Sequence, residues 1–239
     1  MNPLSELARL VLPVACPCGV ADVRWCDSCA AVLSGPPVRV ESAAPRLDRL
    51  DGTPPLPVWA LVPYVGVVRD VVVHWKDRGR ADLDGLLCPA LSRGAGDLAP
   101  VLAAAAGGPV LVVPVPSTGA ALRARGRAPV AALAGAVARG LRQAGADAAT
   151  AQLLHRPGSA RDQVGLGSRA RGRNLASAVR LTRQGRRALP GPCLLVDDVL
   201  TTGATLAAAE RTLEGVGAAV LGAFVLAATP PPDAGISDV

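Results

Sequence analysis

The chain has 239 residues, of which 50% are hydrophobic and 18% are charged, so it can bury a sizeable core and is not disordered throughout. Its 25 basic residues outnumber its 19 acidic residues, and the formal net charge of +6 favours an anionic ligand without selecting one. All of the basic residues except Lys76 are arginine. A chain of this length is typical of one domain with an appendage, or of two small domains.

The first region, residues 1–33, is rich in cysteine and contains a Cys-x-Cys pair followed by a Cys-x-x-Cys pair. The four cysteines concerned are Cys16, Cys18, Cys26 and Cys29. Two such turns can hold one tetrahedral zinc ion, although the first turn is one residue shorter than the usual Cys-x-x-Cys. The pattern predicts a structural zinc site, in which Asp22 or Asp27 could replace a thiolate. Reduced thiols without a metal are the alternative.

Three further regions follow along the chain. Residues 34–57 are rich in Pro, Gly and Ser, which predicts a linker or an irregular connection. From residue 58 to residue 228, apolar runs typical of buried strands alternate with Ala-rich segments that have helical spacing, and residues 229–239 indicate a disordered tail. We expect strands at 58–64, 109–115, 193–196 and 218–227, and helices at 66–77, 128–143 and 203–216. This alternation predicts an α/β domain with a mostly parallel sheet flanked by helices.

A membrane-spanning or secreted protein is not expected. The longest uncharged stretch, residues 98–122, is long enough to span a bilayer, but its prolines and glycines divide it into pieces no longer than one strand or a short helix. The apolar segment 10–15 is too short for a signal peptide. We therefore expect a cytoplasmic protein without membrane insertion, in which the cysteines are thiols or metal ligands rather than disulfides.

Residues 193–205, CLLVDDVLTTGAT, carry the strongest functional signal in the chain. An apolar strand leads into Asp197 and Asp198, and a threonine-rich loop with one glycine then opens a helix. Ligands of open α/β sheets bind at the carboxyl ends of strands, where a helix N-terminus offers backbone N–H groups to a phosphate. Two adjacent carboxylates repel a phosphate, but they match the vicinal hydroxyls of a sugar. Together these features predict a pocket for ribose 5-phosphate.

Two other interpretations of this segment are a nucleotide-hydrolase strand and a purely structural helix start. An apolar strand ending in two acids also occurs as the Walker B strand of nucleotide hydrolases, but these need a Gly-rich loop ending in Lys-Ser or Lys-Thr. Lys76, in HWKDRG, is the only lysine, so the chain has no such loop. In the second alternative, Thr201 or Thr202 is a plain helix N-cap and the two acids are a solvated strand end.

Residues 193–205 resemble the loop that binds phosphoribosyl pyrophosphate (PRPP) in type I phosphoribosyltransferases, and they match that pattern at every position. The resemblance implies that Asp197 and Asp198 hold the ribose 2′- and 3′-hydroxyls. It also implies that the 5′-phosphate is held by the loop residues Thr201, Thr202, Gly203, Ala204 and Thr205. Enzymes of this fold that use hypoxanthine or guanine have an aspartate general base where this chain has Thr201, which argues against 6-oxopurine substrates.

Nearly the whole chain resembles the ComF family of bacterial competence-associated proteins. The resemblance rests on the PRPP loop and on the segments YVGVVRDVVVHWKDRGR, LVVPVPSTGAALRARGRAPVAALA and LLHRPGSARDQVGLGSRARGRNLASAV, which occur in the family's order. It implies a type I phosphoribosyltransferase-like fold joined to a small N-terminal zinc knuckle. It also implies that Mg²⁺ binds together with PRPP.

The arginine-rich loops are candidates for binding the pyrophosphate group of PRPP. Departure of pyrophosphate from ribose needs its charge stabilised, which positioned cations and a metal ion can do. The candidate residues are Ser117, Arg123 and Arg125 in the first loop, and Arg156, Arg161, Gln163 and Arg169 in a later Gly-rich loop that could close over the ligand. A solvated, flexible basic surface is the alternative for each of these arginines.

The leading functional hypothesis is a PRPP-binding protein that transfers ribose 5-phosphate to an unknown acceptor and releases pyrophosphate. The alternative is a non-catalytic accessory factor for DNA uptake that binds single-stranded DNA or competence proteins; a regulator that senses PRPP without turnover is a third possibility. With three tryptophans, one tyrosine and one phenylalanine, the chain is poorly supplied for stacking bases. Any contact with DNA is therefore expected to be electrostatic and to weaken with salt.

Overall fold

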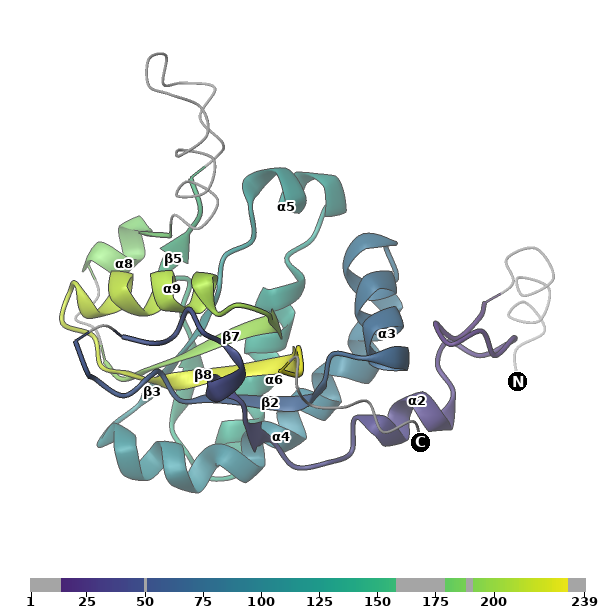
Figure 1. Ribbon diagram of the computed structural model, residues 1–239, viewed down its shortest axis with the longest axis horizontal. Helices are drawn as coiled ribbons and strands as arrows, with labels where there is room; N and C mark the ends of the chain where they lie inside the picture. The colour runs from purple at the N-terminus through teal and green to yellow at the C-terminus, as the bar shows by residue number, and fades with distance from the viewer. Residues whose placement is uncertain (1–13, 50, 158–178, 188–190, 232–239) are drawn as a thin grey trace, which may run out of the picture.

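The computed structural model describes residues 14–49, 51–157, 179–187 and 191–231. Its main feature is a six-stranded sheet in the order β1-β2-β8-β7-β3-β4, in which only the short edge strand β1 is antiparallel to its neighbour (Figure 1). The strands are β1 (Val38–Arg39), β2 (Val58–Pro63), β3 (Val110–Pro114), β4 (Ala148–Thr150), β7 (Cys193–Leu200) and β8 (Val220–Ala228). The expected mostly parallel α/β sheet is thus confirmed.

Helices cover both faces of the sheet. The helices of the described residues are α2 (Asp27–Val32), α3 (Gly66–Asp77), α4 (Asp84–Ala106), α5 (Gly119–Arg125), α6 (Pro129–Gln143), α8 (Arg183–Arg187) and α9 (Ala204–Glu214), with the 3₁₀ turns η1 (Glu41–Ala43) and η2 (Ala81–Leu83). A small antiparallel pair, β5 (Leu154–His155) and β6 (Arg180–Leu181), forms a separate sheet. Figure 1 shows α9 on one side of the main sheet and α4 on the other.

The central strand β7 shows why both faces are buried. Leu194 and Val196 belong to the core cluster formed with α3, α4 and α6, whereas Cys193 and Leu195 belong to the cluster formed with α9. Successive side chains of a strand point to opposite faces, so an uninterrupted apolar run is what a sheet covered on both sides requires. The acid pair lies near the carboxyl end of this buried strand.

Two elements differ from expectation. Strand β7 continues through the acid pair, because its backbone stays paired with β8 as far as Leu200 and Ala228. Pro100 does not divide the uncharged stretch as expected, because α4 runs for 23 residues with Pro89 and Pro100 inside it; the stretch is divided at Gly107, where α4 ends. A long series of buried leucines and alanines holds α4 together despite these prolines. Even so, no helix of the described residues has the length and apolar character needed to cross a membrane.

Residues 34–49 and 51–57 contain only the two-residue strand β1 and the 3₁₀ turn η1 as regular structure, and they pack closely against the domain. Ala44 and Leu47 are almost completely buried in the same cluster as α9. The backbone N–H of Arg46 donates a hydrogen bond to the carbonyl oxygen of Thr202 at 3.0 Å. This segment therefore supports the loop that follows β7.

Candidate functional site

A cleft of about 450 Å³ lies where β2, β3 and β7 end. It is within the size range of small-molecule sites, and it occupies the position where ligands of open α/β sheets bind. The predicted site residues that line it are Asp197, Asp198, Thr201, Thr205, Ser117, Arg125 and Arg156. Segments far apart in the sequence thus meet at one edge of the sheet.

The acid pair forms one wall of the cleft. Asp198 is 3% exposed, and Asp197 is partly exposed. One oxygen of each is engaged locally: Asp197 Oδ1 accepts from the N–H of Asp198, and Asp198 Oδ1 accepts from the N–H of Val199, both at 2.8 Å. Burial and the adjacent charge of Asp198 raise the pKa of the Asp197 carboxyl. The ionised form of Asp197 is therefore less favourable here than in water.

The second oxygen of Asp198 has one charged neighbour. Lys76 Nζ lies 2.5 Å from Asp198 Oδ2, but the contact lacks hydrogen-bond geometry, and this oxygen is buried without any hydrogen-bond partner among the described residues. An acceptor of this kind is costly to bury unless something pairs with it. The ion pair offsets part of that cost, but the oxygen still lacks a hydrogen-bond donor.

The loop after β7 is shaped by the irregular segment behind it. Gly203 has φ 79°, in the left-handed region, and a Cβ atom added there would lie 2.7 Å from Cγ of Leu47. Thr202 Oγ1 accepts from the N–H of Ala204 at 3.4 Å, while Thr201 and Thr205 line the cleft. Glycine is required here both for the turn and for the close approach to Leu47. The loop thus presents two threonines and the start of α9 to the cleft.

The opposite wall is formed by the turn after β3 and by α5. Ser117 lines the cleft, and Thr118 caps α5 by accepting from the N–H of Ala121 at 3.2 Å. Arg125 Nη2 lies 2.8 Å from Asp77 Oδ1, which connects α5 to the end of α3. Arg156 reaches the cleft from the segment after β5 and forms no ion pair with the described residues.

Not every predicted pyrophosphate residue meets this cleft. Arg123 lies on α5, with its Nη1 atom close to Gly119, and does not line the cleft. Arg161, Gln163 and Arg169 lie outside the described residues.

Several polar residues of the cleft were not predicted from the sequence. They are Tyr64, Lys76, Asp77 and Thr118. Lys76 and Asp77 follow Val72 and Val73 by one helical turn on α3, and all four face the cleft. Helical spacing could have grouped these four residues, but only the fold brings them opposite a strand more than a hundred residues away.

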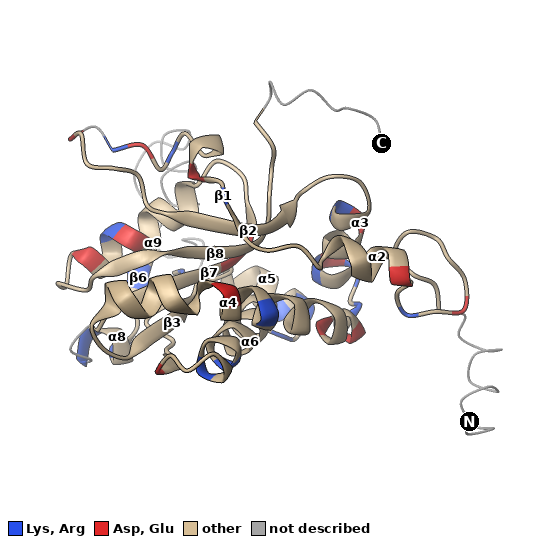
Figure 2. Ribbon diagram, turned by 90° about the horizontal axis from the view of Figure 1, so that it is seen from below, with Lys and Arg blue, Asp and Glu red and all other residues tan. Residues whose placement is uncertain are grey.

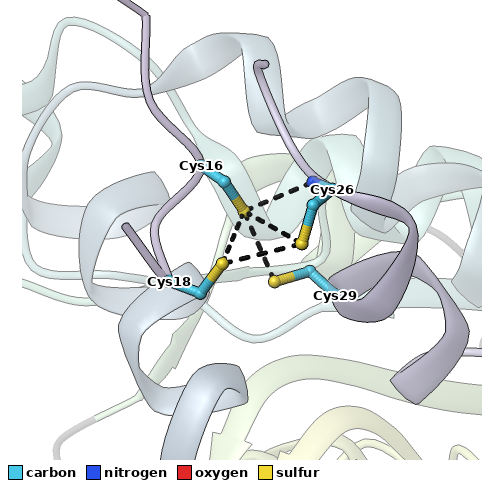
Figure 3. Close-up of side chains that lie close together, drawn as sticks. All are labelled: Cys16, Cys18, Cys26 and Cys29. Atoms are coloured by element: carbon cyan, nitrogen blue, oxygen red, sulfur yellow. Dashed lines mark hydrogen bonds between the residues drawn. The ribbon is translucent and has the colours of Figure 1, made fainter. Parts of the chain in front are cut away.

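The four N-terminal cysteines form a compact cluster (Figure 3). Their Sγ atoms all lie within 4.8 Å of one another, and the group contains neither Asp22 nor Asp27. Four of the separations are 3.3 Å for Cys16–Cys18, 3.4 Å for Cys16–Cys29, 3.6 Å for Cys18–Cys26 and 3.8 Å for Cys16–Cys26. A ZnS₄ tetrahedron with Zn–S bonds of about 2.3 Å has S···S edges of about 3.8 Å. All six cysteines are free, and the four thiols together could bind one metal ion.

Electrostatics within the cluster favour a thiolate at Cys16. Burial raises the pKa of this thiol, but hydrogen bonds from the backbone and side chain of Cys18, from the backbone of Cys26 and from the Cys29 thiol outweigh it and lower the pKa to about 7. Burial, followed by the neighbouring thiols, raises the pKa of Cys29. A metal ion binds all four cysteines as thiolates, so with the ion bound the four sulfur atoms no longer share protons among themselves.

Arg80 attaches the cysteine region to the domain. Its Nη1 donates to the carbonyl oxygen of Ala15 at 2.7 Å, and its Nη2 donates to that of Arg24 at 2.9 Å. The same guanidinium pairs with Asp82 at 2.8 Å. Arg80 therefore binds both ends of the segment that encloses the first two cysteines, close to where thiolate charge accumulates.

Comparison with known proteins gives no assignment, because no family model and no curated protein matches this chain.

Proposed function

We propose that this protein binds PRPP in the cleft and transfers ribose 5-phosphate to an acceptor, as a ComF-like protein of the type I phosphoribosyltransferase class. The observation that carries the proposal is the acid pair, of which Asp198 is buried, beside a threonine loop at a helix start, at the carboxyl edge of a parallel sheet. Carboxylates suit the ribose hydroxyls, and the loop suits a phosphate. The two requirements of a ribose 5-phosphate are thus met by neighbouring residues.

Each part of the ligand has a partner of matching chemistry. Asp197 and Asp198 would accept hydrogen bonds from the ribose hydroxyls, and Thr201 and Thr205 would donate to the 5′-phosphate together with backbone N–H groups at the start of α9. The pyrophosphate would lie against the turn at Ser117, with the arginines of the opposite wall near its oxygens. The cleft extends in this direction, because residues of both β7 and α5 line it.

The transfer step needs little from the chain beyond positioning and charge. The bond between C1 of ribose and the pyrophosphate oxygen breaks, the pyrophosphate takes the electron pair, and the acceptor supplies the pair for the new bond to C1. Carboxylate oxygens are hard ligands that suit Mg²⁺, so the acid pair fits this ion, which would neutralise charge on the departing pyrophosphate. The charged residues that line the cleft are three acids and three cations, so the cleft by itself offers no net positive charge.

The cysteine cluster would bind one structural zinc ion through Cys16, Cys18, Cys26 and Cys29. Four thiolate ligands complete a tetrahedral site and leave no open position, so zinc there would stabilise the fold and take no part in the reaction. Arg80 would offset part of the negative charge of the tetrathiolate site.

Titration calorimetry of PRPP with Mg²⁺ tests the binding proposal. The wild type is expected to bind saturably, and the Asp197→Asn/Asp198→Asn variant is expected to lose affinity by at least about tenfold, roughly 1.4 kcal/mol or more. Asp97 and Asp147 are exposed acids outside the cleft, so Asp97→Asn/Asp147→Asn removes the same charge and is expected to bind as the wild type. Absence of saturable binding by the wild type at millimolar PRPP would overturn the proposal.

A second candidate function is supported by the surface around α8. Exposed arginines gather on β6, α8 and α9: Arg180, Arg183, Arg186, Arg187 and Arg211. None of them forms an ion pair within the part of the chain that the structure describes, and Figure 2 shows the basic segment at α8. Such a patch favours a polyanion such as single-stranded DNA, with affinity that falls steeply with salt. Fluorescence anisotropy of a labelled oligonucleotide in a salt series, with Arg183→Gln/Arg186→Gln/Arg187→Gln as the variant, tests this function.

A further inference from the structure

Lys76 is the only lysine of the chain, and α3 places it in the cleft. Its side chain is 31% exposed, whereas the side chain of its partner Asp198 is 5% exposed. The ammonium group therefore lies between the buried acid and the open volume of the cleft. Val72 lies one helical turn before Lys76 and Trp75 directly precedes it, and both are buried in the core, so the helix itself is held firmly.

The ion pair occupies an atom that the proposed function assigns to the ligand. Oδ2 is the oxygen of Asp198 that lacks a hydrogen bond, whereas Oδ1 already accepts one from the N–H of Val199, so a ribose hydroxyl that satisfies the missing bond donates to Oδ2. Lys76 Nζ lies 2.5 Å from that same Oδ2. Binding of the sugar and the ion pair with Lys76 thus compete for one oxygen.

The other cations of the cleft are in different situations. Arg125 is paired with Asp77 at 2.8 Å and helps to hold α5 against α3. Arg156 forms no ion pair with the described residues. Lys76 differs from both, because its partner is the acid that a ligand would take.

We propose that Lys76 distinguishes ligands that carry an anionic group at C1 of ribose, such as pyrophosphate, from ribose 5-phosphate itself. This inference rests on the proposed function. When PRPP binds, Lys76 leaves Asp198 to the sugar and pairs with the pyrophosphate, so one ion pair replaces another. Ribose 5-phosphate breaks the same ion pair and offers no anion at C1 in exchange.

The chemistry of lysine suits this exchange. An ammonium group on a flexible four-carbon stem can turn from one anion to another without a change in the backbone, whereas a guanidinium needs a fixed planar partner. Selectivity of this kind comes from a contact that the poorer ligand breaks without replacement. A purely structural ion pair would instead affect both ligands equally and would appear mainly as a loss of stability.

Calorimetry with two ligands separates these roles. We expect Lys76→Met, which keeps the length and apolar stem of the side chain, to weaken binding of Mg²⁺·PRPP by at least about tenfold. Affinity for ribose 5-phosphate should stay unchanged or increase, because Asp198 Oδ2 becomes free. Lys76→Arg, which retains the charge, should recover part of the PRPP affinity.

The outcomes distinguish this inference from the proposed function. Equal losses for the two ligands, or no loss for PRPP, would overturn the role of Lys76 while leaving the ribose 5-phosphate site intact. If the wild type binds neither ligand, the proposed function itself fails and this inference fails with it. Arg78→Met, at an exposed position two residues away, removes the same charge from outside the cleft and is the matched control.

A measurement on the unsubstituted protein does not depend on the folding of any variant. Reductive methylation with ¹³C-formaldehyde labels the single lysine and the N-terminal amine, whose carbon resonances are separate. Dimethylation keeps the charge of Lys76. Saturating Mg²⁺·PRPP is expected to shift the lysine resonance clearly, and ribose 5-phosphate is expected to shift it less. A resonance that does not move while PRPP binds would overturn the inference.

Discussion

The cleft and the cysteine cluster are organised in opposite ways. The acid pair lies on the central strand β7, whose flanking residues are buried on both faces of the sheet, so its position is fixed by the core of the whole domain. The cysteine cluster is built from a short segment whose regular structure is the six-residue helix α2 and which contributes few residues to the core. A site on a central strand inherits stability from the core, whereas a small knuckle needs a ligand or a covalent link. Loss of a residue or ligand at one site should therefore change local stability differently from the same loss at the other site.

Loss of the proposed zinc ion should have the largest effect, and the effect should be local. Cys29→Ser, or treatment with a strong chelator, removes a ligand or the metal from a segment that has little core of its own. We expect amide hydrogen exchange of residues 16–33 to speed up by at least about a hundredfold, while β7 and β8 keep their protection. Affinity for PRPP should change by less than about threefold, because the cleft lies on the central strands.

Cys88→Ser is the matched control, because Cys88 is a half-buried thiol of α4 outside the cluster. It should leave exchange of the knuckle unchanged. If amide protons of β7 and β8 lose protection from exchange together with those of residues 16–33, the two regions are not independently stable as we expect.

The loop after β7 provides the next largest effect. Gly203→Ala places a Cβ atom 2.7 Å from Cγ of Leu47 and strains a residue at φ 79°. We expect a loss of about 2–3 kcal/mol in the free energy of unfolding, of which about 1–2 kcal/mol comes from the left-handed backbone. PRPP affinity should also fall, because the loop moves. Denaturant unfolding and calorimetry measure the two effects.

A second glycine with positive φ separates the cost of contact with Leu47 from the cost of backbone strain. Gly217 has φ 81°, and a Cβ atom added there would meet nothing within 4 Å. Gly217→Ala should therefore show the backbone strain alone and leave PRPP affinity unchanged. If the two substitutions cost the same free energy, the close approach to Leu47 contributes nothing.

The sequence predicted the contiguous parts of the structure well and the long-range parts poorly. The helix expected at residues 66–77 is α3, with the same bounds, because its apolar residues recur at helical spacing. The acid pair and the threonine loop were found because strand, acids, loop and helix follow one another in thirteen residues. Helix α4 was not predicted: Pro100 was expected to interrupt the chain, whereas tertiary packing stabilises a helix that contains it.

The partners of the acid pair could not have been predicted in the same way. Lys76 and Asp198 are far apart in sequence, and Leu47 contacts Gly203 from a segment that looked like a linker. No local pattern encodes such contacts, because they depend on the order of the strands and on which helix lies beside which strand. The same limit explains why the cysteine spacing alone left the metal ligands open, whereas the structure brings the four thiols together without Asp22 or Asp27.

The smallest predicted effect concerns the acid pair itself. Burial and the charge of Asp198 raise the pKa of Asp197 in the folded protein above its ordinary value of 3.8. As pH rises from this value, the unfolded chain loses its proton first, so ionisation of Asp197 lowers the stability of the folded state. Asp197→Asn removes this penalty, and we expect the melting temperature at pH 7 to rise by about 2–4 °C, equivalent to roughly 1 kcal/mol for a domain of this size.

The difference between Asp197→Asn and the wild type should shrink as pH falls toward 4, and thermal melts across this range measure it. Asp97→Asn, at an exposed position, should show no such pH dependence. A variant that is less stable than the wild type at pH 7 would mean that the carboxylate stabilises the fold. If instead the variant is more stable but binds PRPP more weakly, the acid pair lowers stability and is needed for binding. That combination is characteristic of a binding site and not of a structural ion pair.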